Sequence, residues 1–174
     1  MQENLSEVKV EVINKSKSLP LPKYETKGSD GFDFRACFDS GEKAIVYSRE
    51  LGKLEVDLNP EDTTIVLSPG ERALIPTGLF MAIPEGFRLH VTPRSGLALK
   101  NGITVLNTPG KIDSDYRGGI GIIIINHGFE DFVIKHNDRI AQGAIELSCQ
   151  LEWVEVETLS ETERGEGGFG HTGK

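Results

Sequence analysis

The sequence predicts an all-β domain, a jelly-roll-like sandwich or barrel with one short helix and a flexible C-terminal arm. Short apolar or alternating runs recur along the chain, and most are flanked by Gly, Pro, Asn or Asp. No stretch sustains the apolar period of a helix. Regularly spaced short strands in a chain of 174 residues indicate one domain built from packed or closed sheets.

The first strand is expected where Val8, Val10 and Val12 alternate with polar residues, and another follows at 54–58. The remaining strands are expected at 63–67, 72–75, 87–91, 120–125, 131–134 and 151–156. The run at 120–125 is apolar on both faces, so we expect it to lie centrally in the domain or against a neighbouring subunit.

One helical segment is expected at 96–101, ended by Gly102. The sequence Leu51-Gly52-Lys53-Leu54 fits a two-residue hairpin turn with Gly52 at the first central position. We expect the all-β domain to cover residues 1–160 and a Gly-rich arm to cover residues 161–174.

Composition narrows the class of function. The chain carries 27 acidic and 19 basic side chains, so its net charge of −8 disfavours nucleic acid as a partner. No apolar run approaches the length of a membrane span, no secretory leader pattern opens the chain, and two lone cysteines indicate reduced thiols. We therefore expect a soluble, cytoplasmic protein that binds a small phosphorylated ligand and neither nucleic acid nor a membrane.

The last eleven residues combine five glycines with one aromatic ring and groups that suit phosphate. Glycines let backbone N–H groups approach an oxyanion closely. Arg164 offers a guanidinium fork and Thr172 a hydroxyl, while Phe169, next to Gly170, is free to stack on a base. The tail therefore predicts a nucleotide clamp, with a loose terminus as the alternative.

Four further segments are candidates for chemistry. They are Asp30-Gly31-Phe32-Asp33-Phe34-Arg35-Ala36, Pro93-Arg94-Ser95-Gly96-Leu97-Ala98, Gly110-Lys111-Ile112-Asp113-Ser114-Asp115-Tyr116-Arg117-Gly118 and Asp138-Arg139-Ile140-Ala141-Gln142. In this order they resemble the first four motifs of the trimeric dUTPases, and the tail resembles the fifth. Five ordered motifs are a far more specific signal than any one alone.

The resemblance implies a jelly-roll homotrimer with three active sites at subunit interfaces. Each site is expected to draw motifs from different subunits, and the arm at 161–174 is expected to close the site of a neighbour. The implied reaction is Mg²⁺-dependent hydrolysis of dUTP to dUMP and pyrophosphate, with water attacking the α-phosphorus. Such a reaction keeps uracil out of DNA and supplies dUMP.

Hydrolysis of a phosphoanhydride needs an aligned water and a base that takes its proton. By resemblance that base is Asp113, although a lone aspartate beside a turn is more often a cap or an ion-pair partner. Asp113 and Tyr116 should meet the same ligand, which requires a bulge or bend between them. Asp115 is then expected to be structural, with Arg117 as its partner.

A hairpin is expected around Gly110 and Asp113, and the same segment is expected to select the nucleoside. By resemblance Tyr116 packs against the deoxyribose and leaves no room for a 2′-hydroxyl, while Asn107 and the main chain near Gly110 read the uracil edge. The alternatives are an interface role for Tyr116 and an ordinary turn role for Asn107.

Phosphate and metal contacts are assigned to the other motifs by resemblance. Arg94, Ser95 and Gly96 are expected to contact the α and β phosphates. The alternative is that Ser95 only caps the helix. Gln142 is expected to contact phosphate or an ordered water, whereas Arg139 is as well explained by a structural ion pair.

Asp33 resembles the aspartate that holds Mg²⁺ through water while the phosphates carry the metal. Its alternative is an inward-facing strand carboxylate satisfied by backbone N–H groups. The scattered histidines suggest no metal site. Arg164, Phe169, Gly170 and Thr172 are expected to cover the base and the outer phosphate.

The chain departs from the family pattern at three places, one of which is Asn137, where a glycine often precedes Asp-Arg. Gly119 stands where the family often has a carboxylate, and the segment 37–68 is longer than the usual connection, so we expect peripheral extra strands there. A dCTP deaminase would need a glutamate near the ring, which 118–128 lacks. A catalytically silent dUTP-binding regulatory protein is the other alternative, and the presence of Asp113 favours hydrolysis over it.

Overall fold

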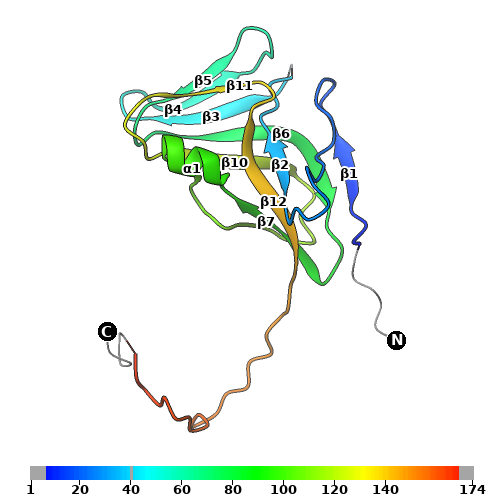
Figure 1. The fold of residues 1–174 in the computed structure, drawn as a ribbon, viewed down its shortest axis with the longest axis vertical. Helices are drawn as coiled ribbons and strands as arrows, with labels where there is room; N and C mark the ends of the chain where they lie inside the picture. The colour runs from blue at the N-terminus through cyan, green and yellow to red at the C-terminus, as the bar shows by residue number, and fades with distance from the viewer. Residues whose placement is uncertain (1–6, 40, 169–174) are drawn as a thin grey trace.

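The computed structural model describes residues 7–39 and 41–168, which form twelve strands and one short helix (Figure 1). The strands are β1 Glu11–Asn14, β2 Phe32–Arg35, β3 Lys43–Ser48, β4 Gly52–Asp57, β5 Thr64–Leu67, β6 Arg72–Ala82, β7 Phe87–Thr92, β8 Ile103–Val105, β9 Gly110–Ile112, β10 Gly119–Asn126, β11 Phe132–Lys135 and β12 Arg139–Leu147, and the helix is α1 Ser95–Asn101. The all-β prediction with one short helix is confirmed. No helix in the described ranges is long and apolar enough to cross a membrane.

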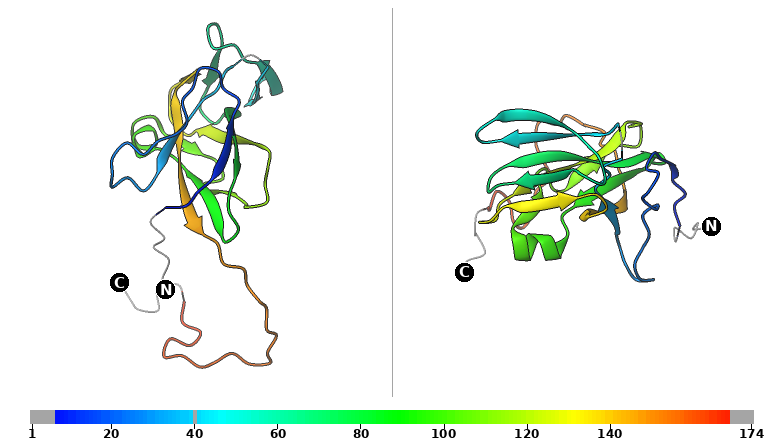
Figure 2. Two further views of the ribbon diagram at one scale, coloured as in Figure 1. Left: turned by 90° about the vertical axis from the view of Figure 1, so that its right-hand side faces the viewer. Right: turned by 90° about the horizontal axis from the view of Figure 1, so that it is seen from above.

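The strands form three antiparallel sheets. One has the order β4-β3-β6-β10-β8, with β1 also paired to β6; the second has the order β2-β12-β7-β9; and β11 pairs with β5. The sheets pack on one another without closing, so the molecule is a sandwich rather than a closed barrel (Figure 2). Each sheet contributes fully buried side chains to one core, among them Phe34, Leu67, Ile75, Leu89 and Ile124.

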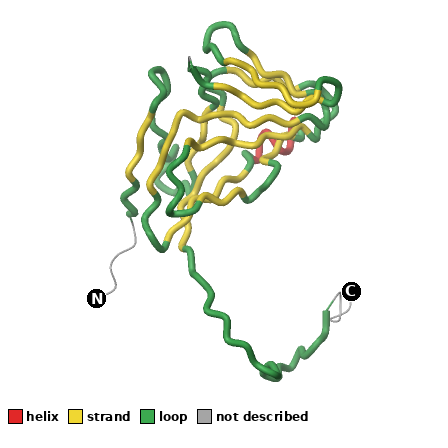
Figure 3. Tube along the Cα trace, turned by 180° about the vertical axis from the view of Figure 1, so that it is seen from behind, coloured by secondary structure: helices red, strands yellow, loops and turns green. Residues whose placement is uncertain are grey.

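Two predicted strands differ from the structure. The first strand begins at Glu11, so the Val8 to Val12 alternation overlaps it only at its end. The predicted strand at 151–156 is wrong, because these residues lie in a long loop that leaves the body of the sandwich (Figure 3). A strand requires a partner for its backbone hydrogen bonds, and no strand in the described part of the chain pairs with these residues. Trp153 in this loop is consequently 87% exposed.

The segment 37–68 contains β3 and β4, and β4 lies at the edge of the six-stranded sheet. Ser48 pairs with Gly52, so the hairpin turn is formed by residues 49–51 and the predicted turn position is wrong. Gly52 nevertheless uses the conformational freedom of glycine, since it has a positive φ of 70° at the first position of β4. Glu71 anchors the turn by accepting hydrogen bonds from the backbone N–H groups of Arg49 and Ser68, and these bonds lower the pKa of its carboxyl.

Strand β6 carries a bulge opposite β10. The register moves from Gly119 paired with Phe80 to Gly121 paired with Pro76, which leaves three residues of β6 opposite Ile120. The buried hydroxyl of Thr77 stabilises the bulge, because it donates to the Ile120 carbonyl at 2.7 Å and accepts from the Leu79 N–H at 3.3 Å. The bulge thereby sets the path of β10 where it borders the candidate active site.

Candidate active site

The third motif, in the segment expected to be a hairpin, forms a pocket of about 210 Å³ between β7, β8, β9 and β10, which we call the hairpin pocket. Its lining brings together four of the predicted residues, which are Asn107, Gly110, Asp113 and Tyr116. Strand β9 positions this segment, because Gly110 pairs with Val91 of β7. Strand β8 pairs with β10 in the other sheet, so the expected hairpin does not form. A Cβ at Gly110 would lie 3.4 Å from both Val91 Cβ and Asn107 Nδ2, so any larger side chain would crowd this wall.

The predicted bend between Asp113 and Tyr116 is confirmed. Strand β9 ends at Ile112, and the Tyr116 N–H donates to the Asp113 carbonyl at 3.2 Å in a tight turn. Both side chains therefore line the same pocket, although strict strand alternation would place them on opposite faces.

The expected ion pair between Asp115 and Arg117 is wrong. Arg117 Nη1 instead donates to the Ser114 carbonyl at 2.6 Å and to the Tyr116 carbonyl at 3.0 Å. The guanidinium thus stabilises the turn through main-chain acceptors, which suit the fork of an arginine as well as a carboxylate does.

Tyr116 closes the pocket in a defined orientation. Its hydroxyl donates to the Gly119 carbonyl at 3.0 Å, and its side chain is 45% exposed. The ring lies against Gly118, where a Cβ would overlap the Tyr116 hydroxyl. Gly118 is therefore needed for the ring to lie over its own turn.

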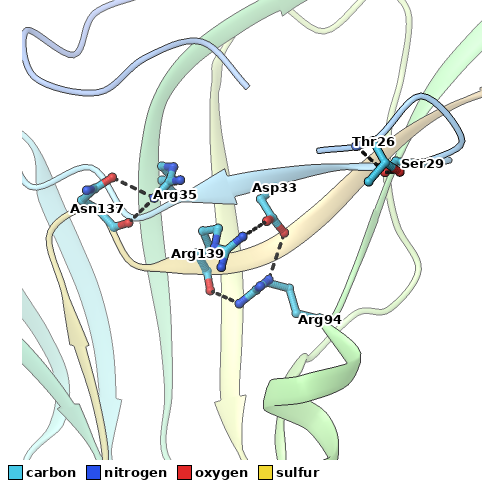
Figure 4. A network of polar contacts seen from close by, with 7 residues as sticks. All are labelled: Thr26, Ser29, Asp33, Arg35, Arg94, Asn137 and Arg139. Carbon is cyan, nitrogen blue, oxygen red and sulfur yellow. Dashed lines mark hydrogen bonds and ion pairs between the residues drawn. The ribbon is translucent and has the colours of Figure 1, made fainter. Parts of the chain in front are cut away.

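A second group of predicted residues gathers on the four-stranded sheet (Figure 4). Asp33 Oδ1 accepts from Arg94 Nε at 2.9 Å, and Asp33 Oδ2 accepts from Arg139 Nη1 at 3.0 Å. Arg94 Nη1 also donates to the Arg139 carbonyl at 3.3 Å. Gln142 pairs with Asp33 in the β2–β12 ladder, and both line a second pocket of about 350 Å³.

This cluster bears on two of the alternatives. Arg139 forms the ion pair that one interpretation expected, and the carboxylate of Asp33 is satisfied by two guanidinium groups rather than by backbone N–H groups. The Asp33 side chain is only 10% exposed, so the pairing is partly shielded from water. Sequence reasoning missed the contact between Asp33 and Arg94, which joins the first motif to the second.

Helix α1 begins directly after Arg94 and carries Ser95 and Gly96 in its exposed first turn. Arg94 occupies the N-cap position in extended conformation, and no side chain caps the helix, so the interpretation of Ser95 as a cap is wrong. The predicted C-terminus is confirmed, because Gly102 has φ 68° and its N–H donates to the Ala98 carbonyl at 3.1 Å.

Asp33 also bears on the predicted metal. Within residues 7–39 and 41–168, no group of three or more His, Cys, Asp or Glu side chains is placed to hold a metal ion. Both Asp33 oxygens already accept from arginine, which disfavours direct coordination. Each oxygen keeps a second acceptor position, so the residue fits a Mg²⁺ ion that is reached through water and brings other ligands with it.

The predicted clamp is only partly described. Arg164 is exposed and donates through Nε to the Gly167 carbonyl at 2.7 Å, within a turn in which the Gly165 N–H also donates to the Thr162 carbonyl. Phe169, Gly170 and Thr172 lie outside the described residues.

Among the residues that the structure describes, none lines both the hairpin pocket and the second pocket. The residues predicted for one nucleotide therefore form two separate groups within a single chain.

Comparisons with known proteins agree with the resemblance. A family model described as dUTPase matches residues 56–173. The deoxyuridine 5'-triphosphate nucleotidohydrolase of Caulobacter vibrioides is 50% identical over 155 residues, which are 89% of this chain and 86% of that protein. The enzyme of the same name from Fusobacterium nucleatum is 46% identical over 170 residues, which are 98% of this chain and 100% of that protein.

The fold agrees as well. The dUTPase of Staphylococcus bacteriophage 80alpha, solved with dUPNHPP, matches with a TM-score of 0.73 and 27% sequence identity, covering 95% of this chain and 99% of that one. The family model covers more than half of the chain, and both relatives share nearly half of their residues with it over almost its whole length. This chain belongs to the dUTPase family.

Proposed function

We propose that this protein hydrolyses dUTP to dUMP and pyrophosphate, with Mg²⁺ bound to the triphosphate. The observation that carries the proposal is the hairpin pocket, in which a carboxylate, an amide side chain and an aromatic ring line one cavity. Membership of the dUTPase family and the activity named for the Caulobacter vibrioides relative support the same reaction.

In this proposal Asn107 and the main chain at Gly110 read the uracil edge. Cytosine presents an amino donor where uracil presents an acceptor, so an amide fixed to match uracil would leave a polar group unpaired against cytosine. Tyr116, held by its bond to the Gly119 carbonyl, would take up the space that a 2′-hydroxyl needs. The pocket therefore rejects UTP by steric exclusion and dCTP by mismatched hydrogen bonds.

Asp113 acts as the general base in this scheme. It takes a proton from the water that attacks the α-phosphorus, and Gln142 contacts a phosphate oxygen or an ordered water. Arg94, Ser95 and Gly96 face the α and β phosphates from the exposed start of α1. Bound Mg²⁺ would neutralise and orient the triphosphate, and Asp33 is proposed to hold it through water.

We propose that the active site is shared within a homotrimer. The hairpin pocket and the pocket of Asp33 and Gln142 share no lining residue, which supports this arrangement. The exposed loop after β12 provides a route by which the arm at 161–174 reaches a neighbouring copy's site, where Arg164, Phe169, Gly170 and Thr172 would close over the nucleotide.

The function is tested by measuring pyrophosphate release from dUTP, dTTP, dCTP and UTP, each with Mg²⁺ and with a chelator. We expect release from dUTP that depends on Mg²⁺ and little from the other three. Conversion of dCTP to a uracil nucleotide would instead identify a deaminase. Tight binding of dUTP without any release would identify a silent regulatory protein.

The assembly is tested by light scattering at micromolar concentration. We expect a mass of three chains, since the proposed site takes residues from neighbouring copies. A monomer with full activity would contradict the shared site, because one chain would then have to complete it alone.

A further inference from the structure

Phe80 occupies the place that a side chain at position 119 would fill. It is the cross-strand partner of Gly119 in the β6–β10 ladder, just before the bulge. A Cβ built on Gly119 would lie 3.2 Å from Phe80 Cζ and 3.5 Å from Cε1. The edge of the ring therefore lies close to Gly119, and a Cβ at that position would make a tight contact that requires the ring to shift.

The Phe80 ring also contacts Lys15, the residue that follows β1. Lys15 Nζ lies over the ring, 4.2 Å from its centroid, and the Lys15 N–H donates to the Gly78 carbonyl at 2.8 Å. On its other edge, β6 pairs with β1, where Ile13 is opposite Phe80. The ring thus has Lys15 over its face and Gly119 at its edge.

Gly119 in turn holds Tyr116. Its carbonyl accepts the Tyr116 hydroxyl at 3.0 Å, and both residues line the hairpin pocket. A continuous series of contacts therefore runs from Lys15 through Phe80 and Gly119 to the ring proposed to face the sugar.

We propose that Phe80 is a positioning residue for sugar selection, which acts by pressing on the Gly119 backbone and so fixing the orientation of Tyr116. The inference rests on the proposed function for its substrate, but the packing of Phe80 beside Gly119 does not depend on that function. It assigns a role to the glycine at 119: the aromatic ring on β6 takes the volume that a longer side chain would need.

The kinetic test compares Phe80→Ala and Phe80→Leu with Phe132→Ala. Phe132 is a control because it is a phenylalanine of the same burial class on another strand, β11, and does not line the hairpin pocket. We expect Phe80→Ala to lower the preference for dUTP over UTP about tenfold, mainly through KM, with kcat within about twofold. Phe80→Leu should fall in between, and Phe132→Ala should keep the preference. An unchanged preference in both Phe80 variants would overturn the proposal.

A second readout does not depend on activity. Hydrogen exchange of the amides at 116–121, without nucleotide, is expected to be about tenfold faster in Phe80→Leu than in the unaltered protein or in Phe132→Ala. If the unaltered protein hydrolyses no dUTP, the proposed function fails while this measurement still decides the packing role. Equal exchange in all three proteins would overturn the packing role.

A double-mutant cycle isolates the contact itself. Gly119→Ala should disturb the exchange of 116–121 when Phe80 is present and much less when Phe80 is alanine, because the added methyl then has room. Strictly additive effects of the two substitutions would show that Phe80 and Gly119 act independently, and would overturn the proposed coupling.

Discussion

Asp113→Asn is expected to lower kcat on dUTP by about a hundredfold to ten-thousandfold while leaving nucleotide affinity nearly unchanged. The amide keeps the shape of the carboxylate at the pocket wall but cannot take the proton of the attacking water. Pyrophosphate release gives kcat, and calorimetry with a non-hydrolysable dUTP analogue and Mg²⁺ gives the affinity.

Asp115→Asn is the matched control for this prediction. Asp115 lies two residues further along the same turn but does not line the hairpin pocket, so its substitution should leave turnover close to normal. Near-normal turnover of Asp113→Asn would instead pass the base role to Asp115 or Asp33. A loss of affinity equal to the loss of turnover would make Asp113 a binding residue.

The sequence was sufficient where apolar alternation is long and uninterrupted. Strand β7 lies close to its predicted position because its apolar residues alternate, and β10 does so because its continuous apolar run is buried on both faces. Strand β12 was missed, since its register shifts between Arg139 and Ala141 and the alternation is broken there. Strands β8 and β9 have only three residues each, which is too short for a period to show.

The candidate site divides in the same way. Resemblance identified the hairpin residues, and the local turn at Asp113 brings them together as expected. The contact of Asp33 with Arg94 depends on the β2–β12–β7 register, and the contact of Phe80 with Gly119 depends on the β6–β10 register. These are long-range pairings that no local pattern encodes.

Deleting residues 164–174 is expected to leave the fold and the trimer intact while reducing hydrolysis of dUTP by about a hundredfold. The described part of the chain supports the first half, because residues 151–166 are exposed and none belongs to the core. Circular dichroism on heating and light scattering check the fold and the assembly, and pyrophosphate release gives the activity.

The loss of hydrolysis is expected because the tail supplies ligand contacts rather than core packing. Arg164 would neutralise the outer phosphate and Phe169 would cover the base, which excludes bulk water and holds the α-phosphorus for attack. The single variant Phe169→Ala, with Lys174→Ala as its control, separates the loss of the ring from the loss of the segment.

The same mechanism predicts how the tail responds to ligand. Hydrogen exchange of residues 165–173 should slow when a non-hydrolysable dUTP analogue and Mg²⁺ are added, since closure gives the backbone N–H groups phosphate partners. Residues 151–156 serve as an internal reference in the same experiment. Equal exchange of the tail with and without the analogue would show that the glycines do not form a clamp, and the truncated protein should then be as active as the full chain.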